Sequence, residues 1–99
     1  MGYKILLADD DRDLLEMLGR YFEMKGYQIL QAGNGTEAVR MSAEEPDLIL
    51  LDINMPGMDG LEVCRKIRGQ VSCPILFLTV RVEEQDRVNG LMMGGMIIS

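Results

Sequence analysis

Hydrophobic and polar positions along this chain alternate in blocks of two kinds. One kind is a short run rich in Ile and Leu, of the length expected of a buried strand. These runs occupy residues 3–8, 28–32, 48–52 and 75–80, and residues 96–98 begin a fifth. The other kind has apolar residues at helical spacing. Its blocks lie at residues 11–25, around residues 38–41 and ending before Pro46, around residues 61–67, and at residues 83–92. Strand and helix alternate, which predicts an α/β domain with a parallel sheet and helices on both faces.

The first helical block predicts both a helix start and a core face. Asp11 stands at the beginning of the helix, where a side-chain oxygen caps free backbone N–H groups. Leu14, Leu18 and either Tyr21 or Phe22 recur at helical spacing. We therefore expect these residues to face the sheet.

Acidic residues close two of the predicted strands. Asp9 and Asp10 follow the first run, and Asp52 ends the third. Function collects at the carboxyl ends of parallel strands, so neighbouring strands would gather these acids at one edge of the sheet. Carboxylates that close repel one another unless a cation lies among them, and Mg²⁺ prefers oxygen ligands. The sequence thus predicts a site for a hard divalent cation.

Composition narrows the possible functions. The chain has 99 residues, enough for one small domain, and 47% of them are hydrophobic. Its formal net charge of −6 argues against binding nucleic acid through this segment. It contains no histidine, which excludes His-based metal sites, a Ser-His-Asp triad and a phosphohistidine donor.

The cysteines and the apolar segments indicate the compartment. Cys64 lies at a predicted core position and Cys73 directly precedes Pro74, so we expect both thiols to be reduced. No apolar stretch approaches the length needed to span a membrane, and the N-terminus lacks a long apolar signal region. A cytoplasmic domain without membrane contact is the resulting expectation.

Three stretches of the sequence resemble the receiver domains of bacterial two-component response regulators. They are residues 5–11 (ILLADDD), residues 46–60 (PDLILLDINMPGMDG) and residues 74–79 (PILFLT). Their order and spacing agree with that family over residues 3 to about 95. The resemblance implies a three-layer α/β/α, flavodoxin-like fold with strand order 2-1-3-4-5.

The same resemblance implies roles for individual residues. Asp52 would be the phosphoacceptor, phosphorylated by a sensor histidine kinase in a Mg²⁺-dependent reaction. Asp10 would bind Mg²⁺ directly, Asp9 through a water, and Asn54 through its backbone carbonyl, with Asp52 completing the metal site. Thr79 would donate its hydroxyl to a phosphoryl oxygen. The module would take part in its own phosphoryl transfer without being an enzyme in the usual sense.

Ordinary structural roles remain open for several of these residues. Asp9 and Asp10 could cap the first helix and place charge in its first turn. Asp52 could be a strand-end turn residue, and Thr79 a β-branched strand residue. Pro56 and the glycines near it are interpreted as shaping the loop.

The chain departs from the family pattern after residue 95. With residues 96–98 as the fifth strand, Met96 replaces the family's aromatic residue and Ser99 its lysine. We therefore expect residues 1–99 to be a receiver domain incomplete at its C-terminus, with a short fifth strand and no final helix. A dimer, or a strand-exchanged dimer, would cover the resulting edge.

Three functions are compatible with these residues. The first is a phosphoacceptor module whose partners are a sensor histidine kinase and an output domain or downstream protein. The second is a degenerate receiver that binds proteins without being phosphorylated, which the two replacements favour. The third, an independent phosphatase or phosphotransferase using Asp52 and Asn54, lacks a general acid or base at a suitable spacing after Asp52.

Overall fold

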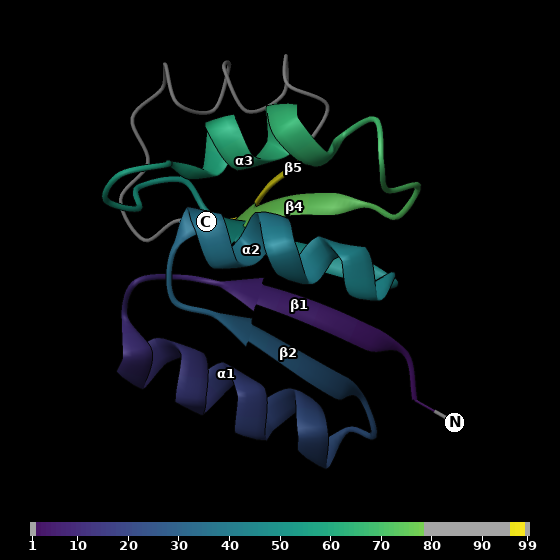
Figure 1. The fold of residues 1–99 in the computed structure, drawn as a ribbon. Coiled ribbons are helices and arrows are strands. Elements are labelled where there is room, and N and C mark those ends of the chain that lie inside the picture. The colour runs from purple at the N-terminus through teal and green to yellow at the C-terminus, as the bar shows by residue number, and fades with distance from the viewer. Residues whose placement is uncertain (1, 79–95, 99) are drawn as a thin grey trace.

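Five parallel strands form a single sheet. The computed structural model describes residues 2–78 and 96–98. The strands are β1 (Lys4–Ala8), β2 (Gln28–Ala32), β3 (Leu48–Asp52), β4 (Ile75–Leu78) and β5 (Met96–Ile98). Their order in the sheet is β2-β1-β3-β4-β5, as Figure 1 shows, which confirms the predicted topology. The predicted helix at residues 83–92 and the end of the fourth predicted strand lie outside the described residues.

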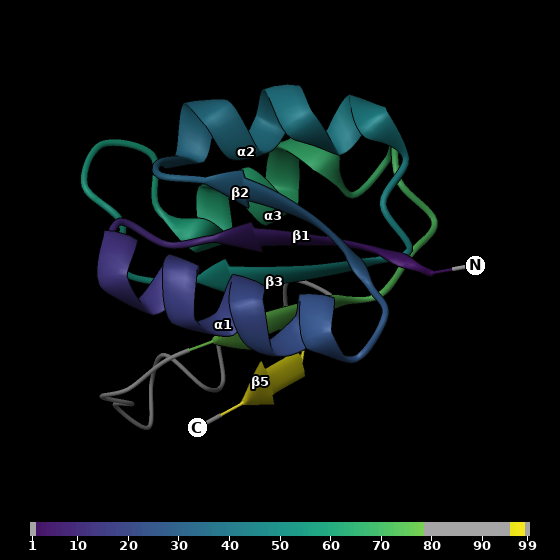
Figure 2. The same cartoon turned by 90° about the horizontal axis from the view of Figure 1, so that it is seen from below.

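Helices cover both faces of this sheet. They are α1 (Arg12–Met24), α2 (Gly35–Met41) and α3 (Gly60–Ile67), and a short 3₁₀ turn, Ser42–Glu44, follows α2. Figure 2 shows α1 on one face and both α2 and α3 on the other. The arrangement is the predicted three-layer α/β/α sandwich.

Alternate residues of β1 supply two separate cores. Leu6 and Ala8 are buried in the cluster beneath α2 and α3, whereas Ile5 and Leu7 belong to the cluster beneath α1. All four side chains are at most 3% exposed. A strand covered on both faces needs apolar residues at every position, which explains why β1 is a continuous apolar run.

The core face of α1 differs in part from the prediction. Leu15, which the helical spacing did not single out, is 3% exposed and is the buried leucine of this helix. Leu18 and Phe22 pack against the same cluster, while Tyr21 is 54% exposed. Phe22 is therefore the core residue of the two aromatic candidates, and the stripe runs through positions 15, 18 and 22 because these lie on one side of a helix.

The described residues also test the predictions made for Asp11 and for the two cysteines. Asp11 is the N-cap of α1, and its Oδ1 accepts hydrogen bonds from the backbone N–H groups of Asp13 and Leu14, as predicted. Neither Cys64 nor Cys73 belongs to a disulfide, and burial raises the pKa of both thiols. In the part of the chain that the structure describes, no helix is long and apolar enough to cross a membrane.

Candidate functional site

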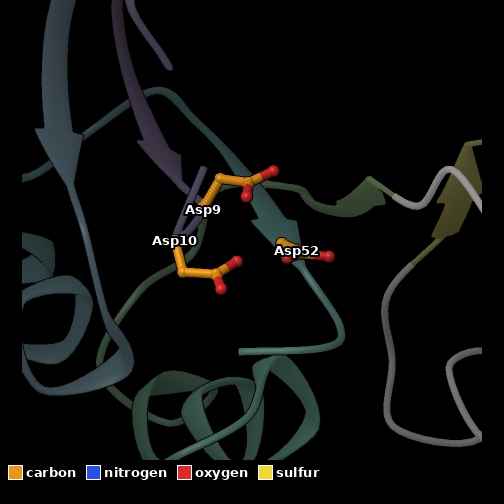
Figure 3. A group of neighbouring side chains, drawn as sticks. All are labelled: Asp9, Asp10 and Asp52. Atoms are coloured by element: carbon orange, nitrogen blue, oxygen red, sulfur yellow. The ribbon is translucent and has the colours of Figure 1, made fainter. Parts of the chain in front are cut away.

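The register of two neighbouring strands brings the three acids together. β1 pairs with β3 in parallel, and Ala8 lies opposite Leu51. Asp9, which follows Ala8, and Asp52, which follows Leu51, therefore leave the same edge of the sheet. Figure 3 shows these two residues and Asp10 gathered there.

The carboxylates are close enough to share one cation. Oxygen atoms of Asp9, Asp10 and Asp52 all lie within 4.8 Å of one another. Asp9 is 6% exposed and Asp52 is 9% exposed, while Asp10 is exposed. The convergence predicted from strand ends is confirmed, with two buried acids and one at the surface.

Backbone donors orient the two buried carboxylates. The N–H of Asp11 donates to Asp9 Oδ1 at 2.9 Å, and the N–H of Asn54 donates to Asp52 Oδ1 at 3.3 Å. Because Asp11 caps α1, capping does not account for Asp9 or Asp10. Asn54 lies beside the cluster, held there through its own backbone.

The electrostatics of the cluster favour a bound cation. Burial, followed by the charge of Asp9, raises the pKa of Asp52 from 3.8 to about 7, and burial also raises the pKa of Asp9. Three ion pairs within 4.0 Å join glutamates to arginines among the described residues, and none of these three includes Asp9, Asp10 or Asp52. A divalent cation would supply the missing positive charge, and an all-oxygen donor set suits Mg²⁺.

The loop after β3 is compact and anchored at both ends. Ile53 and Met55 are each 4% exposed and contribute to the core beneath α2 and α3. The N–H of Gly60 donates to the carbonyl of Ile53 at 3.0 Å, which closes the loop on itself. Asp59 caps α3 through a 2.9 Å hydrogen bond to the N–H of Glu62. These contacts hold Asn54 next to the acidic cluster.

The end of β2 also contacts the cluster. The N–H of Asp9 donates to the carbonyl of Ala32 at 3.1 Å, which ties the cluster to this strand. Sequence patterns did not reveal this contact, because only the pairing of β1 with β2 creates it. Thr79, the remaining predicted site residue, lies outside the described residues, so its role stays a prediction.

A family model described as the response regulator receiver domain matches residues 5–98. The chain belongs to this family. Among its relatives, the transcriptional regulatory protein ResD of Bacillus subtilis is 47% identical over 92 residues, which are 92% of this chain and 38% of that protein. The chain spans about two-fifths of the length of the curated relatives it matches, with shares of 41%, 40% and 38% for three of them.

Solved receiver structures agree with the fold. The chemotaxis protein CheY4 of Vibrio cholerae gives a TM-score of 0.90 at 29% identity, covering 98% of this chain and 84% of that one. The BeF₃-activated N-terminal receiver domain of Klebsiella pneumoniae RstA gives 0.87 at 33% identity, covering 95% of this chain and 81% of that one. The resemblance inferred from the three sequence stretches is thereby confirmed.

Receiver domains as a family share several general properties. Receiver domains are signalling modules of two-component systems that bind Mg²⁺ at an acidic pocket. They interact with sensor histidine kinases and with output domains, and they catalyse their own phosphoryl transfer. In this chain, carboxylate oxygens of Asp9, Asp10 and Asp52 form an acidic cluster.

Proposed function

We propose that this receiver domain accepts a phosphoryl group on Asp52 from the phosphohistidine of a sensor histidine kinase, in a Mg²⁺-dependent reaction. The observation that carries the proposal is the position of Asp52 at the end of β3. Its carboxylate is 9% exposed and lies within 4.8 Å of those of Asp9 and Asp10. No other described group of three or more acidic or cysteine side chains comes together in this way.

In the proposed transfer, a carboxylate oxygen of Asp52 forms the new bond to phosphorus. The P–N bond of the donor breaks, and its electron pair returns to the imidazole. Bound Mg²⁺ would neutralise charge on the carboxylates and on the phosphoryl oxygens. Asp52 must be ionised to attack, and its pKa of about 7 without a cation means that much of it is protonated near neutral pH.

The other residues of the site hold the reacting groups in place. Asp10 and Asp52 would ligate the cation directly, Asp9 through a water, and Asn54 through its backbone carbonyl. The N–H of Asn54 fixes one oxygen of Asp52, which leaves the other oxygen for attack. Thr79 would donate its hydroxyl to a phosphoryl oxygen.

The partners belong to the same proposal. A phosphorylated receiver acts through an output domain or a downstream protein, and the curated relatives are named as transcriptional regulatory proteins. Nucleic-acid contact would then be made by such an output domain and not by residues 1–99, whose formal charge is −6. Cytoplasmic action, as is typical of response regulators, completes the proposal.

Intact-mass measurement tests this function. The protein is incubated with Mg²⁺ and a small-molecule phosphodonor, alongside the Asp52→Asn variant. We expect one added phosphoryl group, labile to hydroxylamine, on the wild-type protein alone. An adduct equally present on Asp52→Asn contradicts the assignment of the phosphoacceptor.

Two other results would point to different functions. A folded wild-type protein that takes up no phosphoryl group favours a binding module that works without phosphorylation. Donor consumption far beyond one equivalent per lifetime of the acyl phosphate favours an independent enzyme. Circular dichroism of the wild-type protein and of Asp52→Asn, recorded in the same buffer, establishes that each sample is folded.

A further inference from the structure

The start of α2 lies against the loop that follows Asp52. A Cβ atom added at Gly35 would overlap the backbone carbonyl oxygen of Met58 and would lie 2.8 Å from Met58 Cβ and 3.0 Å from Val63 Cγ2. Real Cβ atoms essentially never approach other atoms so closely, and a backbone atom cannot rotate away. Only glycine fits at this contact.

Conformational freedom does not explain this glycine. The described glycines with positive φ are Gly26 and Gly57, and Gly35 is not among them. Alanine is also the better helix former by about 1 kcal/mol. Helix propensity alone would therefore favour Ala at position 35, and what excludes it is the space taken by Met58.

The segment that contains Gly35 is tied to both acid-bearing strands. Ala32, three residues earlier, accepts the N–H of Asp9 at 3.1 Å. Gly35 itself contacts Met58, within the loop that Gly60 closes onto Ile53. Residues 32–35 thus connect the segment that carries Asp9 with the loop that carries Asn54.

Neither side of this contact can move without affecting the acids. The start of α2 is fixed by Asn34, whose Oδ1 accepts the N–H of Glu37 at 2.8 Å, and by the N–H of Gly33, which donates to Glu37 Oε1 at 2.8 Å. If this end yields, it displaces the Ala32 carbonyl that Asp9 contacts. If the loop yields, it displaces Asn54, because closely packed structure transmits such shifts.

We propose that Gly35 is a positioning residue of the acidic site, setting the distance between the Asp9 side and the Asp52 side through its contact with Met58. Gly35 touches neither the cation nor the phosphoryl group. This inference rests on the proposed function of the site for its effect on Mg²⁺, although the contact itself does not.

The test compares Gly35→Ala with Gly2→Ala. A Cβ at Gly2 would overlap the carbonyl oxygen of Gly26, so the control introduces the same kind of backbone clash. Gly2 precedes β1 and therefore lies at the edge of the sheet opposite Asp9. Mg²⁺ affinity is measured by titration calorimetry, and Mn²⁺ binding is followed by its electron paramagnetic resonance signal.

We expect Gly35→Ala to weaken cation binding about tenfold, the lower end of the effect of residues that position metal ligands. Its phosphorylation rate should recover at saturating Mg²⁺. Because a bound cation also stabilises the folded state, circular dichroism of the metal-free variant is needed to distinguish weaker binding from a loss of folded protein. Gly2→Ala should bind the cation as the wild type does. Equal affinities in all three folded proteins would overturn the proposal.

Nuclear magnetic resonance of the metal-free protein separates this inference from the proposed function. Gly35→Ala should shift the amide signals of Asp9 and Asn54, and Gly2→Ala should leave both unchanged. If these shifts occur but the wild-type protein binds no Mg²⁺, the missing Mg²⁺ binding refutes the proposed function, while the shifts still support the positioning contact. Unshifted amides would overturn the positioning role, whatever the wild-type protein binds.

A second variant covers the case in which Gly35→Ala does not fold. Met58→Gly removes the Met58 Cβ that faces Gly35 and loosens the same contact from the loop side. Weaker Mg²⁺ binding by this variant supports the inference, and wild-type affinity contradicts it.

Discussion

Acidic residues interact differently at the two ends of strands β1 and β3. At the edge where β1 and β3 begin, Asp47 Oδ2 accepts the N–H of Lys4 at 2.8 Å, and the N–H of Asp47 donates to the Lys4 carbonyl at 2.7 Å. Where these strands end, the side chains of Asp9, Asp10 and Asp52 lie close together, with carboxylate oxygens within 4.8 Å of one another (Figure 3). An acid at the first edge links two strands, whereas the acids at the second edge repel one another.

The difference shows which carboxylates serve the fold. A charge that receives hydrogen bonds at an exposed edge is compatible with a stable protein. Buried charges next to other charges reduce stability, and they persist where a ligand offsets them. The pKa of Asp52, raised to about 7 by burial and by Asp9, records that unfavourable arrangement.

The largest expected effect is on cation affinity. Asp10→Asn should weaken Mg²⁺ binding by about 100-fold, because it removes a charged direct ligand, a greater loss than removing a residue that only orients one. Calorimetric titration measures the change. Asp47→Asn, the same substitution at the opposite edge, serves as the control and should bind Mg²⁺ normally. Comparable weakening in both would show that overall charge, and not the cluster, governs binding.

A smaller effect is expected in the pH dependence of stability. With a pKa of about 7 in the folded state and 3.8 in the unfolded state, Asp52 binds its proton more tightly when folded. The stabilisation that comes from this tighter proton binding is complete below about pH 4 and is lost as the pH rises through 7. Metal-free protein should lose about 1–3 kcal/mol of unfolding free energy across this range.

Urea denaturation at several pH values, with the metal removed by chelation, measures this loss. Asp52→Asn cannot ionise at this position and should lose less stability over the same range. Added Mg²⁺ should restore stability at pH 7 in the wild type alone. Identical pH profiles for the two metal-free proteins would contradict the shifted pKa.

At the other edge, Asp47→Ala should destabilise the protein by about 1 kcal/mol. The substitution leaves the N–H of Lys4 without its side-chain acceptor, and the loss of one hydrogen bond has this size. Thermal denaturation measures the effect, and Mg²⁺ affinity should not change. A changed affinity would show that the two edges are coupled through β1 and β3.

The smallest effect is expected for Lys4→Met. This substitution removes the exposed 2.9 Å hydrogen bond from Lys4 Nζ to the carbonyl of Glu44, and keeps the backbone hydrogen bonds of Lys4. We expect a loss of ~0.5 kcal/mol, at the lower end for one hydrogen bond, because water replaces an exposed partner. A loss above that of Asp47→Ala would reverse the ranking of these two contacts.

Much of the fold could be predicted because it rests on local patterns. The apolar runs of β1 and β3 indicated buried strands, and Asp11 indicated the start of α1. The burial of Leu15 could not be predicted, because Leu14 and Leu15 are adjacent leucines and only the placement of α1 on the sheet distinguishes them. Tyr21 and Phe22 presented the same ambiguity, and packing resolved it.

Part of the candidate site could likewise be predicted from the sequence. The acids Asp9, Asp10 and Asp52 were identified because they end two strands of a predicted parallel sheet. Thr79 stays a prediction. The close contact of Gly35 with Met58 went unpredicted, since a glycine that follows Asn34 at the start of a helix gives no sign of which distant backbone atom will approach it.

The elements, the class of fold and the residue types at the strand ends could be predicted from the sequence, because hydrophobic periodicity and capping act over a few neighbouring residues. Packing of the folded chain brings the oxygens of Asp9, Asp10 and Asp52 within 4.8 Å of one another and buries Asp52 enough to raise its pKa. Distance and burial depend on strand register and on packing between segments far apart in the chain, and no local pattern encodes them.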